Sequence, residues 1–192
     1  MGKKVFNILG PSGSGKTTIA KKLLTGFDNI KIEKIITDTS RNIRKYDGEV
    51  DGQDYYFKDK QEMLGLMREG CYFEINDKFI SGTLYGIRHE ELNNKINSDS
   101  SALVIVTDFN GTKRLKEKFK EDLITVYIDI DILALKERMK NRGDSEETIK
   151  ERIEKIKSEN SKEIINNCKH IIVNRNLEDS INQFKSIIKK YV

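Results

Sequence analysis

The segment Gly10–Thr17 has the residue types and spacing of a loop that binds phosphate groups. It reads G-P-S-G-S-G-K-T and fits the pattern G-x-x-x-x-G-K-[ST]. Glycines let the backbone turn so tightly that successive N–H groups point inward and form a nest for an anion. In such a loop Lys16 reaches the β- and γ-phosphates of a nucleotide, and the Thr17 hydroxyl can ligate Mg²⁺. The pattern therefore predicts a nucleotide-phosphate site.

Arginines are grouped in two further places, which a lysine-rich surface does not explain. Arg41 and Arg44 lie three residues apart, and Arg138, Arg142 and Arg152 flank an interruption in a helical pattern. Arginine binds phosphate with parallel N–H donors, whereas lysine acts more as a point charge. Phosphoryl transfer needs charge neutralisation and alignment of its reactants more than covalent help from the protein. We predict a phosphate-binding role for Arg41, Arg44, Arg138 and Arg152.

A carboxylate follows one apolar segment at a place where a metal ligand would be useful. Leu103–Val106 is a short apolar run, and Thr107 and Asp108 come directly after it. If the run is a strand, Asp108 lies at the edge of the sheet, where a carboxylate can steady the shell of Mg²⁺. Asp also commonly ends a strand by making a turn. Both roles are open to Asp108 at this point.

A sheet must bring these residues together, and the hydrophobic pattern predicts one. Lys4–Leu9 is typical of a short buried strand and Thr17–Leu24 of a helix, which is the order that the phosphate loop requires. Further strands are predicted at four segments: Ile32–Ile36, Ala102–Val106, Leu123–Ile128 and His170–Val173. Their continuous apolar character favours parallel strands, and their alternation with helical patterns predicts a doubly wound α/β sheet. In such sheets ligands bind beyond the carboxyl ends of the strands, where the loop would lie.

We predict a single domain over residues 1–192 with two additions to the sheet. Residues 1–36 and 96–192 would form the core. Residues 37–95 are rich in Gly, Asp and Tyr and are interpreted as an inserted lobe of short strands and small helices. A lid at about 138–152 would be helical on both sides of an interruption, where Ser145 could cap a new helix.

Composition limits the classes of function. Hydrophobic residues make up 36% of the chain and charged residues 34%, and no apolar run approaches the ~20 residues that cross a membrane. A predicted strand begins near the N-terminus, without a visible signal peptide. The formal net charge is +4 with lysines spread along the chain, so we expect no nucleic-acid partner. Cys71, Cys168, His89 and His170 are isolated, which predicts reduced thiols, a cytoplasmic location and no metal cluster of these residue types.

Several segments, in the right order along nearly the whole chain, resemble the guanylate kinase family. Thr39–Arg44 and Gly48–Phe57 are similar to the family signature T-T-R-x-P-R-x-G-E-x-x-G-x-D-Y-x-F, and Glu69–Glu74 is similar to its G-x-F-x-E segment. Shorter similarities follow at Tyr85-Gly86, Asn110-Gly111, Arg138–Arg152 and Val173-Asn174. The resemblance implies phosphoryl transfer from ATP to GMP or dGMP with Mg²⁺ as the cofactor.

The resemblance also implies roles for residues of this chain. ATP would be bound by the phosphate loop and three later residues: Gly10, Ser12, Gly13, Ser14, Gly15, Lys16, Thr17, Thr18, Arg142 and Asn174. The acceptor would be bound mainly by the inserted lobe: Thr37, Arg41, Arg44, Tyr55, Glu74, Tyr85 and Asp108. Catalysis would depend on four cations: Lys16, Arg41, Arg138 and Arg152. Thr17 and Asp108 would hold Mg²⁺. Glu74 would accept from the N1 and N2 donors of guanine, a pair of donors that adenine does not offer.

Four differences from the family pattern concern the acceptor side. Ile87 stands where the family has Ser or Thr after Y-G, and Val106 replaces the first carboxylate of a D-x-D element. Ile43 replaces a proline, and Lys45–Asp47 lengthens the link to Gly48 by two residues. The lost hydroxyl and carboxylate both come from the side that would read the base.

Two alternatives to a GMP kinase therefore stay open. A related branch that phosphorylates ribose 1,5-bisphosphate also has an aliphatic residue after Y-G, but it lacks the glutamates found here as Glu49 and Glu74. A non-catalytic binding module of the same fold is the second alternative. Such modules typically lose the loop lysine or the lid arginines, whereas Lys16, Arg138 and Arg152 are present here. The sequence predicts neither a monomer nor a particular homo-oligomer.

Overall fold

Five parallel strands form the central sheet of the computed structural model, which describes residues 2–78, 82–141, 143–158 and 165–192. The strands are β1 (Lys4–Leu9), β2 (Ile32–Lys34), β7 (Ala102–Val106), β8 (Leu123–Asp129) and β9 (His170–Val173), in the order β2-β7-β1-β8-β9. β1 is central and pairs in parallel with both β7 and β8. The five predicted strands are thus confirmed, with β2 ending at Lys34 instead of Ile36.

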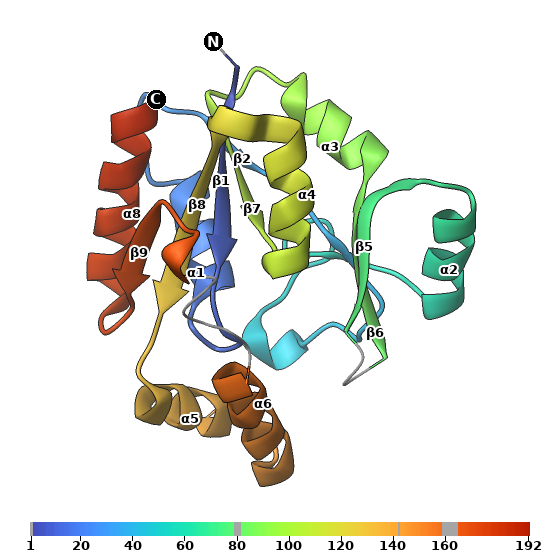
Figure 1. Ribbon diagram of the computed structural model, residues 1–192, viewed down its shortest axis with the longest axis vertical. Coiled ribbons are helices and arrows are strands. Elements are labelled where there is room, and N and C mark those ends of the chain that lie inside the picture. Colours follow the sequence, from blue (N-terminus) through green and yellow to red (C-terminus); the bar gives the residue numbers. More distant parts are fainter. Residues whose placement is uncertain (1, 79–81, 142, 159–164) are drawn as a thin grey trace.

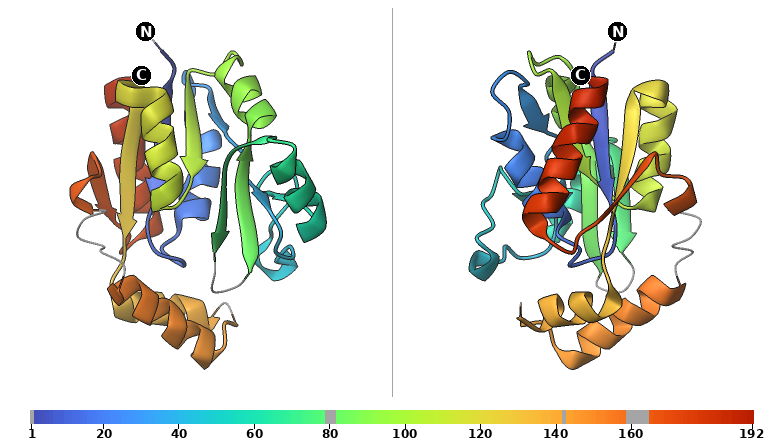
Figure 2. Two further views of the ribbon diagram at one scale, coloured as in Figure 1. Left: turned by 45° about the vertical axis from the view of Figure 1, so that its right-hand side comes forward. Right: turned by 90° about the vertical axis from the view of Figure 1, so that its left-hand side faces the viewer.

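Helices cover both faces of this sheet, as the doubly wound prediction requires. α1 (Lys16–Leu24) and α8 (Leu177–Tyr191) lie on one face, and α3 (His89–Ile96) and α4 (Phe109–Phe119) on the other (Figures 1 and 2). A short 3₁₀ turn, η2 (Lys120–Asp122), connects α4 to β8. On the first face Phe6 of β1 packs with Ile19 and Phe184, and on the second Val5 packs with Leu92 and Leu115. Because consecutive residues of β1 face opposite layers, an almost wholly apolar strand is the expected pattern.

A second sheet makes up the lobe within residues 37–95. It has the order β4-β3-β6-β5, formed by β4 (Tyr56–Phe57), β3 (Asp38–Thr39), β6 (Thr83–Arg88) and β5 (Tyr72–Lys78). α2 (Lys60–Arg68) lies against it, and Asp59 begins this helix by accepting a 2.7 Å hydrogen bond from the Gln61 N–H. The inserted link Lys45–Asp47 forms the 3₁₀ turn η1, which Gly48 ends at a φ of 65°.

Two helices lie beyond the carboxyl ends of the central strands. α5 (Ile132–Asn141) and α6 (Glu146–Ser158) are separated at the interruption predicted from sequence, and together they form the layer below the sheet in Figure 1. The Ser145 hydroxyl accepts the Thr148 N–H at 3.2 Å and so caps α6 as predicted. Leu135 and Met139 of α5 pack with Ile149 and Ile156 of α6 in a separate small core.

None of the helices in the described part of the chain is long and apolar enough to cross a membrane.

Candidate active site

The phosphate loop fits closely between the central strands and the helices around it. Gly10 and Gly15 have φ angles of 139° and 94°, which L side chains rarely adopt. A Cβ atom on Gly10 would lie 2.3 Å from the Ile128 carbonyl oxygen, and one on Gly15 would lie 2.5 Å from Asn174 Nδ2. The loop therefore requires glycine at both positions for conformation and for space.

Lys16 lies over this loop at the start of α1. Its Nζ donates to the carbonyl oxygens of Gly10 and Pro11 at 2.8 and 2.7 Å. Thr17 is half-buried in the first turn of α1, whereas Ser12 and Thr18 are exposed. Among the described residues, the Ser14 hydroxyl is buried and has no hydrogen-bond partner. Unsatisfied buried polar groups are rare, and one inside a phosphate loop is consistent with a ligand-binding surface.

Asn174 supports the loop from the side of the core. Asn174 is only 1% exposed, and its side-chain Nδ2 donates to the Ser14 carbonyl at 2.7 Å. Its Oδ1 accepts from the Ser180 hydroxyl at 3.1 Å, and its backbone N–H donates to Asp129 at 2.8 Å. The predicted ATP residue Asn174 thus contacts the loop itself, which makes it a positioning residue for the loop in this structure.

The helix α5, part of which falls in the predicted lid, also contacts the loop. A Cβ atom on Gly13 would lie 3.0 Å from Leu135 Cδ1, and Arg138 donates to the Asn174 carbonyl at 3.2 Å. The Arg138 guanidinium is therefore next to Gly15 at the edge of the loop. Arg152 belongs to α6, but its side chain is not among those described, and Arg142 lies outside the described residues.

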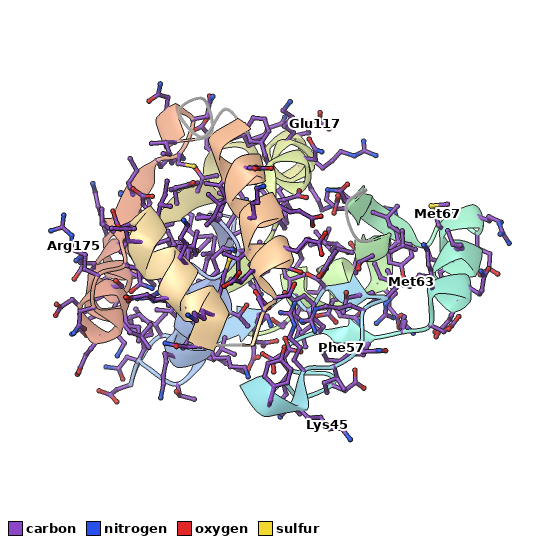
Figure 3. The ribbon with its side chains drawn as sticks, turned by 90° about the horizontal axis from the view of Figure 1, so that it is seen from below. Lys45, Phe57, Met63, Met67, Glu117 and Arg175 are labelled. Carbon is purple, nitrogen blue, oxygen red and sulfur yellow. The ribbon has the colours of Figure 1, made fainter. Side chains whose placement is uncertain are left out.

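Arg41 of the lobe is held by a carboxylate and two aromatic rings. Its NH1 and NH2 donate to the two carboxylate oxygens of Glu49 at 2.7 and 2.5 Å. Its Cζ lies 4.9 Å from the ring centroid of Tyr55 and 5.4 Å from that of Phe57. Tyr55 in turn lies 6.0 Å from the Tyr85 ring in an edge-to-face contact. Figure 3 looks at this edge from below, with Phe57 placed between the lid helices and α2 in that projection.

The charges of this group are fixed by its hydrogen bonds. Burial is the largest single effect and disfavours the charge on Arg41, but the hydrogen bond to Glu49 and the electrostatic attraction of nearby groups together outweigh it, so the pKa of Arg41 is raised above its usual value. Burial likewise opposes the charge on Glu49, yet the side chain of Arg41 and the backbone N–H of Arg44 lower the pKa of Glu49. That N–H donates to Glu49 at 2.8 Å. The Glu49 carboxylate therefore holds both predicted acceptor arginines: it binds the side chain of Arg41 and the backbone N–H of Arg44.

Tyr55 connects the lobe to the phosphate loop. Burial is the main reason that the pKa of Tyr55 is raised, and the neighbouring Tyr85 adds to it. A hydrogen bond with the Thr17 side chain acts in the opposite direction. Tyr55 thus contacts the first turn of α1 on one side and the guanidinium of Arg41 on the other. The predicted donor and acceptor residues are adjacent here.

A second polar group of the lobe faces the start of α4. Glu74 and Asn76 are two residues apart on β5, so their side chains share a face of the sheet. Glu74 Oε2 lies 3.5 Å from where a Cβ atom on Gly111 would be. Asn76 Nδ2 donates to Asp108 Oδ2, and Asp108 Oδ1 accepts the Gly111 N–H at 3.0 Å. Asp108 is therefore the N-cap of α4, which is the turn-forming role left open by the sequence.

The two lost polar positions of the acceptor side lie in apolar surroundings. Ile87 is opposite Glu74 in the antiparallel pair β5–β6 and is fully buried with Leu92 and Leu103. Val106 packs against the core on the other face of the central sheet. Thr37 is nearly buried, and its carbonyl accepts the Tyr56 N–H at 3.1 Å. Thr37 is thus placed between the central sheet and the lobe.

Comparison with known proteins gives this arrangement a family. A family model described as guanylate kinase matches residues 2–191. The chain belongs to the guanylate kinase family. It is 30% identical over 190 residues to a guanylate kinase of Mycoplasma genitalium, covering 96% of this chain and 75% of the relative. It is 33% identical over 187 residues to one from Wigglesworthia glossinidia brevipalpis, covering 95% and 86%.

The fold also resembles that of a guanylate kinase of known structure. The crystal structure of guanylate kinase from Anaplasma phagocytophilum superposes with a TM-score of 0.73 at 24% identity, covering 98% of this chain and 86% of that one. The structure of TT1252 from Thermus thermophilus is more distant, with a TM-score of 0.57 at 13% identity. The guanylate kinase fold therefore accounts for both the central sheet and the lobe.

Sequence reasoning missed several residues of the site. Lys34 is a buried lysine beneath Tyr55, and Asn76 is the amide partner of Asp108. Asn7 lies in the middle of the apolar strand β1, where it accepts from Thr107 at 2.8 Å and donates to Thr112 at 2.7 Å. A polar residue inside a mainly apolar strand was the signal for Asn7, because buried polar groups need partners, whereas Lys34 follows Glu33 on β2 and gave no such signal.

Proposed function

We propose that this protein transfers the γ-phosphoryl group of ATP to GMP or dGMP. The observation that carries the proposal is the position of Tyr55. Asp54, the residue before it, pairs at 2.7 Å with Lys21 of α1, and the ring of Tyr55 lies 4.9 Å from Cζ of Arg41 in the acceptor lobe. A donor phosphate at the loop and an acceptor phosphate at Arg41 would be neighbours. Phosphoryl transfer needs this alignment of two phosphates more than it needs a covalent catalyst.

The donor side would work through the backbone and through cations. N–H groups of the loop and the start of α1 would bind the phosphates of ATP, since a helix N-terminus attracts anions. Lys16 would exchange its bonds with the Gly10 and Pro11 carbonyls for bonds with phosphate oxygens. Arg138 and Arg152 would add positive charge from the lid as negative charge develops on the transferred group.

The residues of the donor side fit a magnesium ion. Mg²⁺ typically keeps several water ligands and binds substrate phosphates with only one or two protein oxygens. Among the described residues no group of three His, Cys, Asp or Glu side chains could hold a metal by itself. We propose that Thr17 is the direct protein ligand and that Asp108 acts through water, because its two oxygens already accept from Asn76 and Gly111. Bound Mg²⁺ would neutralise charge on the phosphates.

The acceptor side would bind phosphate and base at separate places. Arg41, Arg44, Tyr55 and Tyr85 would bind the phosphate, and the rigid pairing of Arg41 with Glu49 leaves it oriented before the nucleotide arrives. Glu74, on the face of β5 toward α4, would accept from the N1 and N2 donors of guanine. Thr37 lies between the two sheets and would contribute a hydroxyl to the O6 edge.

One observation favours a different phosphorylated acceptor as the second candidate. Ile87 is fully buried in the apolar core and offers no hydroxyl to a base. Ribose 1,5-bisphosphate, which has no base, would be phosphorylated without such a contact. Glu74 is the residue that separates the candidates. Its carboxylate would bind the base of GMP, whereas an acceptor without a base offers it no hydrogen-bond donors.

The Glu74→Gln variant tests this function. A glutamine amide would place an N–H donor against the donors of guanine, so we expect kcat/KM for GMP to fall by roughly 100-fold. The exposed Glu69→Gln variant in the turn after α2 is the matched control, with an expected rate near that of the wild type. ADP release with ATP and GMP is measured for all three proteins. Equal rates for the wild type and the Glu74→Gln variant would reject guanine recognition by Glu74.

We further propose a cytoplasmic location. The free thiols Cys71 and Cys168 support it, because secreted proteins commonly carry disulfides.

A further inference from the structure

Lys34 is a buried cation that the proposed reaction does not use directly. It is the last residue of β2 in the central sheet and is 7% exposed. Its Nζ donates to the backbone carbonyls of Gln53 and Asp54 at 2.9 and 2.6 Å. It also lies 5.6 Å from the ring centroid of Tyr55. The ammonium therefore contacts the two residues before Tyr55 and the ring of Tyr55 itself.

The charge of Lys34 is expensive to bury, so its position needs an explanation. Four charged side chains surround it: Asp54 and Glu49 of the lobe, Lys21 of α1 and Glu91 of α3. Burial lowers the pKa of Lys34 to about 8, and attraction to Asp54 only partly offsets it. An apolar side chain at the end of β2 would avoid this cost. However, an apolar side chain could not donate hydrogen bonds to the carbonyls of Gln53 and Asp54 in the lobe, as Lys34 does.

Asp54 ties the same turn to α1. Its carboxylate is fully buried, and Oδ2 accepts from the Val50 N–H at 2.8 Å and pairs with Lys21 Nζ at 2.7 Å. The turn from Val50 to Tyr55 is thus fastened to the core at β2 by Lys34 and at α1 by Lys21. α1 directly follows the phosphate loop in the chain, and β2 is the next element after α1. The fastened turn ends at Tyr55, the residue that joins the donor and acceptor groups.

We propose that Lys34 is a positioning residue for the acceptor phosphate, which it controls by fixing the turn before Tyr55 against the central sheet. The proposal rests on the proposed function for its kinetic consequences. Lys34 does not touch the acceptor; it acts through Tyr55 and thereby through the ring on which Arg41 lies. Loss of the ammonium would leave Tyr55 and Arg41 without a fixed distance from the phosphate loop.

This position makes acceptor binding sensitive to alkaline pH. Well below pH 8 Lys34 is a charged ammonium with three N–H donors. It donates to the carbonyls of Gln53 and Asp54 and lies over the ring of Tyr55. As the pH rises through 8, the neutral amine loses the charge that strengthens both hydrogen bonds and the contact with Tyr55. KM for the acceptor should therefore rise between pH 7 and pH 9, whereas KM for ATP should stay constant.

The test compares Lys34→Met and Lys34→Arg with the wild type and with Lys95→Met. Methionine keeps the length of the side chain without a donor, and arginine keeps the charge at every pH of the assay. Lys95 is a matched control, because its Nζ pairs at 2.8 Å with Glu33, the neighbour of Lys34 on β2, and does not contact the turn. Thermal melting first identifies which variants are folded.

The first measurement is amide hydrogen exchange of residues 50–57 without substrates. We expect faster exchange in Lys34→Met than in the wild type and no change in Lys95→Met. The second is KM for GMP from pH 7 to pH 9. At pH 7 we expect KM to rise by about tenfold in Lys34→Met with kcat changed less, since hydrogen bonds to a charged group are worth a factor of this size. The wild type should show the alkaline rise in KM and Lys34→Met should not.

Each outcome decides a different question. Unchanged exchange in folded Lys34→Met, or an alkaline rise in KM that is as large in Lys34→Met as in the wild type, overturns the role of Lys34. Titration of GMP itself would affect both proteins equally. If Lys34→Arg keeps the low KM for GMP of the wild type at pH 7 and shows no rise in this KM up to pH 9, the result supports the role of the charge. A wild type that does not phosphorylate GMP overturns the proposed function, and hydrogen exchange then still decides whether Lys34 fixes the turn.

Discussion

Lys16 and Arg41 are held in different ways, and the difference indicates what each contributes. Lys16 donates to carbonyls of its own loop, and phosphate oxygens can replace such neutral acceptors at a net gain. Arg41 is bound by both oxygens of Glu49 and covered by two rings, so its guanidinium is oriented in advance. The lysine is suited to follow a phosphate that moves during transfer. The arginine is suited to hold one in place.

Removal of the Lys16 ammonium should abolish transfer while leaving the fold intact. Lys16→Met loses the charge that stabilises the transferred phosphoryl group, and we expect kcat to fall by roughly 10²–10³-fold. Lys22→Met, an exposed lysine on the same helix, should keep the wild-type rate. The measurement is ADP release with saturating ATP and GMP. A Lys16→Met enzyme with the wild-type kcat would contradict the role of this residue.

Glu49 should make part of the stability dependent on acidic pH. Burial opposes its charge, but the hydrogen bonds from Arg41 and from the Arg44 N–H, together with the attraction of both guanidinium groups, lower its pKa in the folded protein. Its contribution is therefore complete above the unfolded pKa and is lost as the pH falls through the lower folded value. Urea unfolding at pH 6 and pH 3.5 should show a smaller loss for Glu49→Gln than for the wild type. Equal losses would contradict the pairing, and exposed Glu117→Gln is the control.

At the scale of elements, the phosphate loop depends on segments that are distant in the chain. Asn174, at the end of β9, supports Ser14 across 160 residues, and α5 packs against Gly13. The N-cap of α4 and the turn after η1 complete the surroundings of the site. The donor loop is thus supported by the core and by the lid together.

Asn174→Ala should destabilise the protein and weaken ATP binding. The substitution leaves the buried Ser14 carbonyl without its donor, which costs about 1–3 kcal/mol. Urea unfolding measures the loss of stability, and calorimetry measures the affinity for ATP. Asn182→Ala, at an exposed position of α8, should change neither quantity. An Asn174→Ala protein with wild-type stability and ATP affinity would show that the loop does not need this support.

The sequence predicts the elements better than the contacts between them. Short segments rich in apolar residues located all five strands of the central sheet, because burial on both faces leaves a strong local pattern; the pattern is weakest in β2, which contains Glu33 and Lys34. The interruption before α6 was also visible, since Ser145 caps a helix locally. The support by Asn174 and the burial of Lys34 were not predicted. Both depend on partners from other elements, and their residue types alone are more typical of a surface.

At the scale of the whole molecule, three parts surround one edge of the central sheet. The core, the lobe and the helices α5 and α6 are these three parts (Figures 1 and 3). We propose that they provide the phosphate loop, Arg41 with Glu74, and Arg138, respectively. Kinases of this kind commonly close over their substrates to exclude water. The lobe is joined to the core by the contacts of Lys34 with Asp54 and Tyr55 and of Asp54 with Lys21, so we expect these contacts to set how donor and acceptor face each other.

The central claim is that the acceptor is a guanine nucleotide, and an acceptor panel tests it most directly. The initial rate of ADP release is measured with ATP, Mg²⁺ and each of GMP, dGMP, AMP, UMP and ribose 1,5-bisphosphate. We predict a kcat/KM for GMP and dGMP roughly 100-fold or more above those for AMP and UMP, because Glu74 finds its two donors only on guanine. Ribose 1,5-bisphosphate should not be phosphorylated. Turnover of ribose 1,5-bisphosphate without turnover of GMP, or no turnover of any acceptor by a protein that binds ATP, would contradict the account.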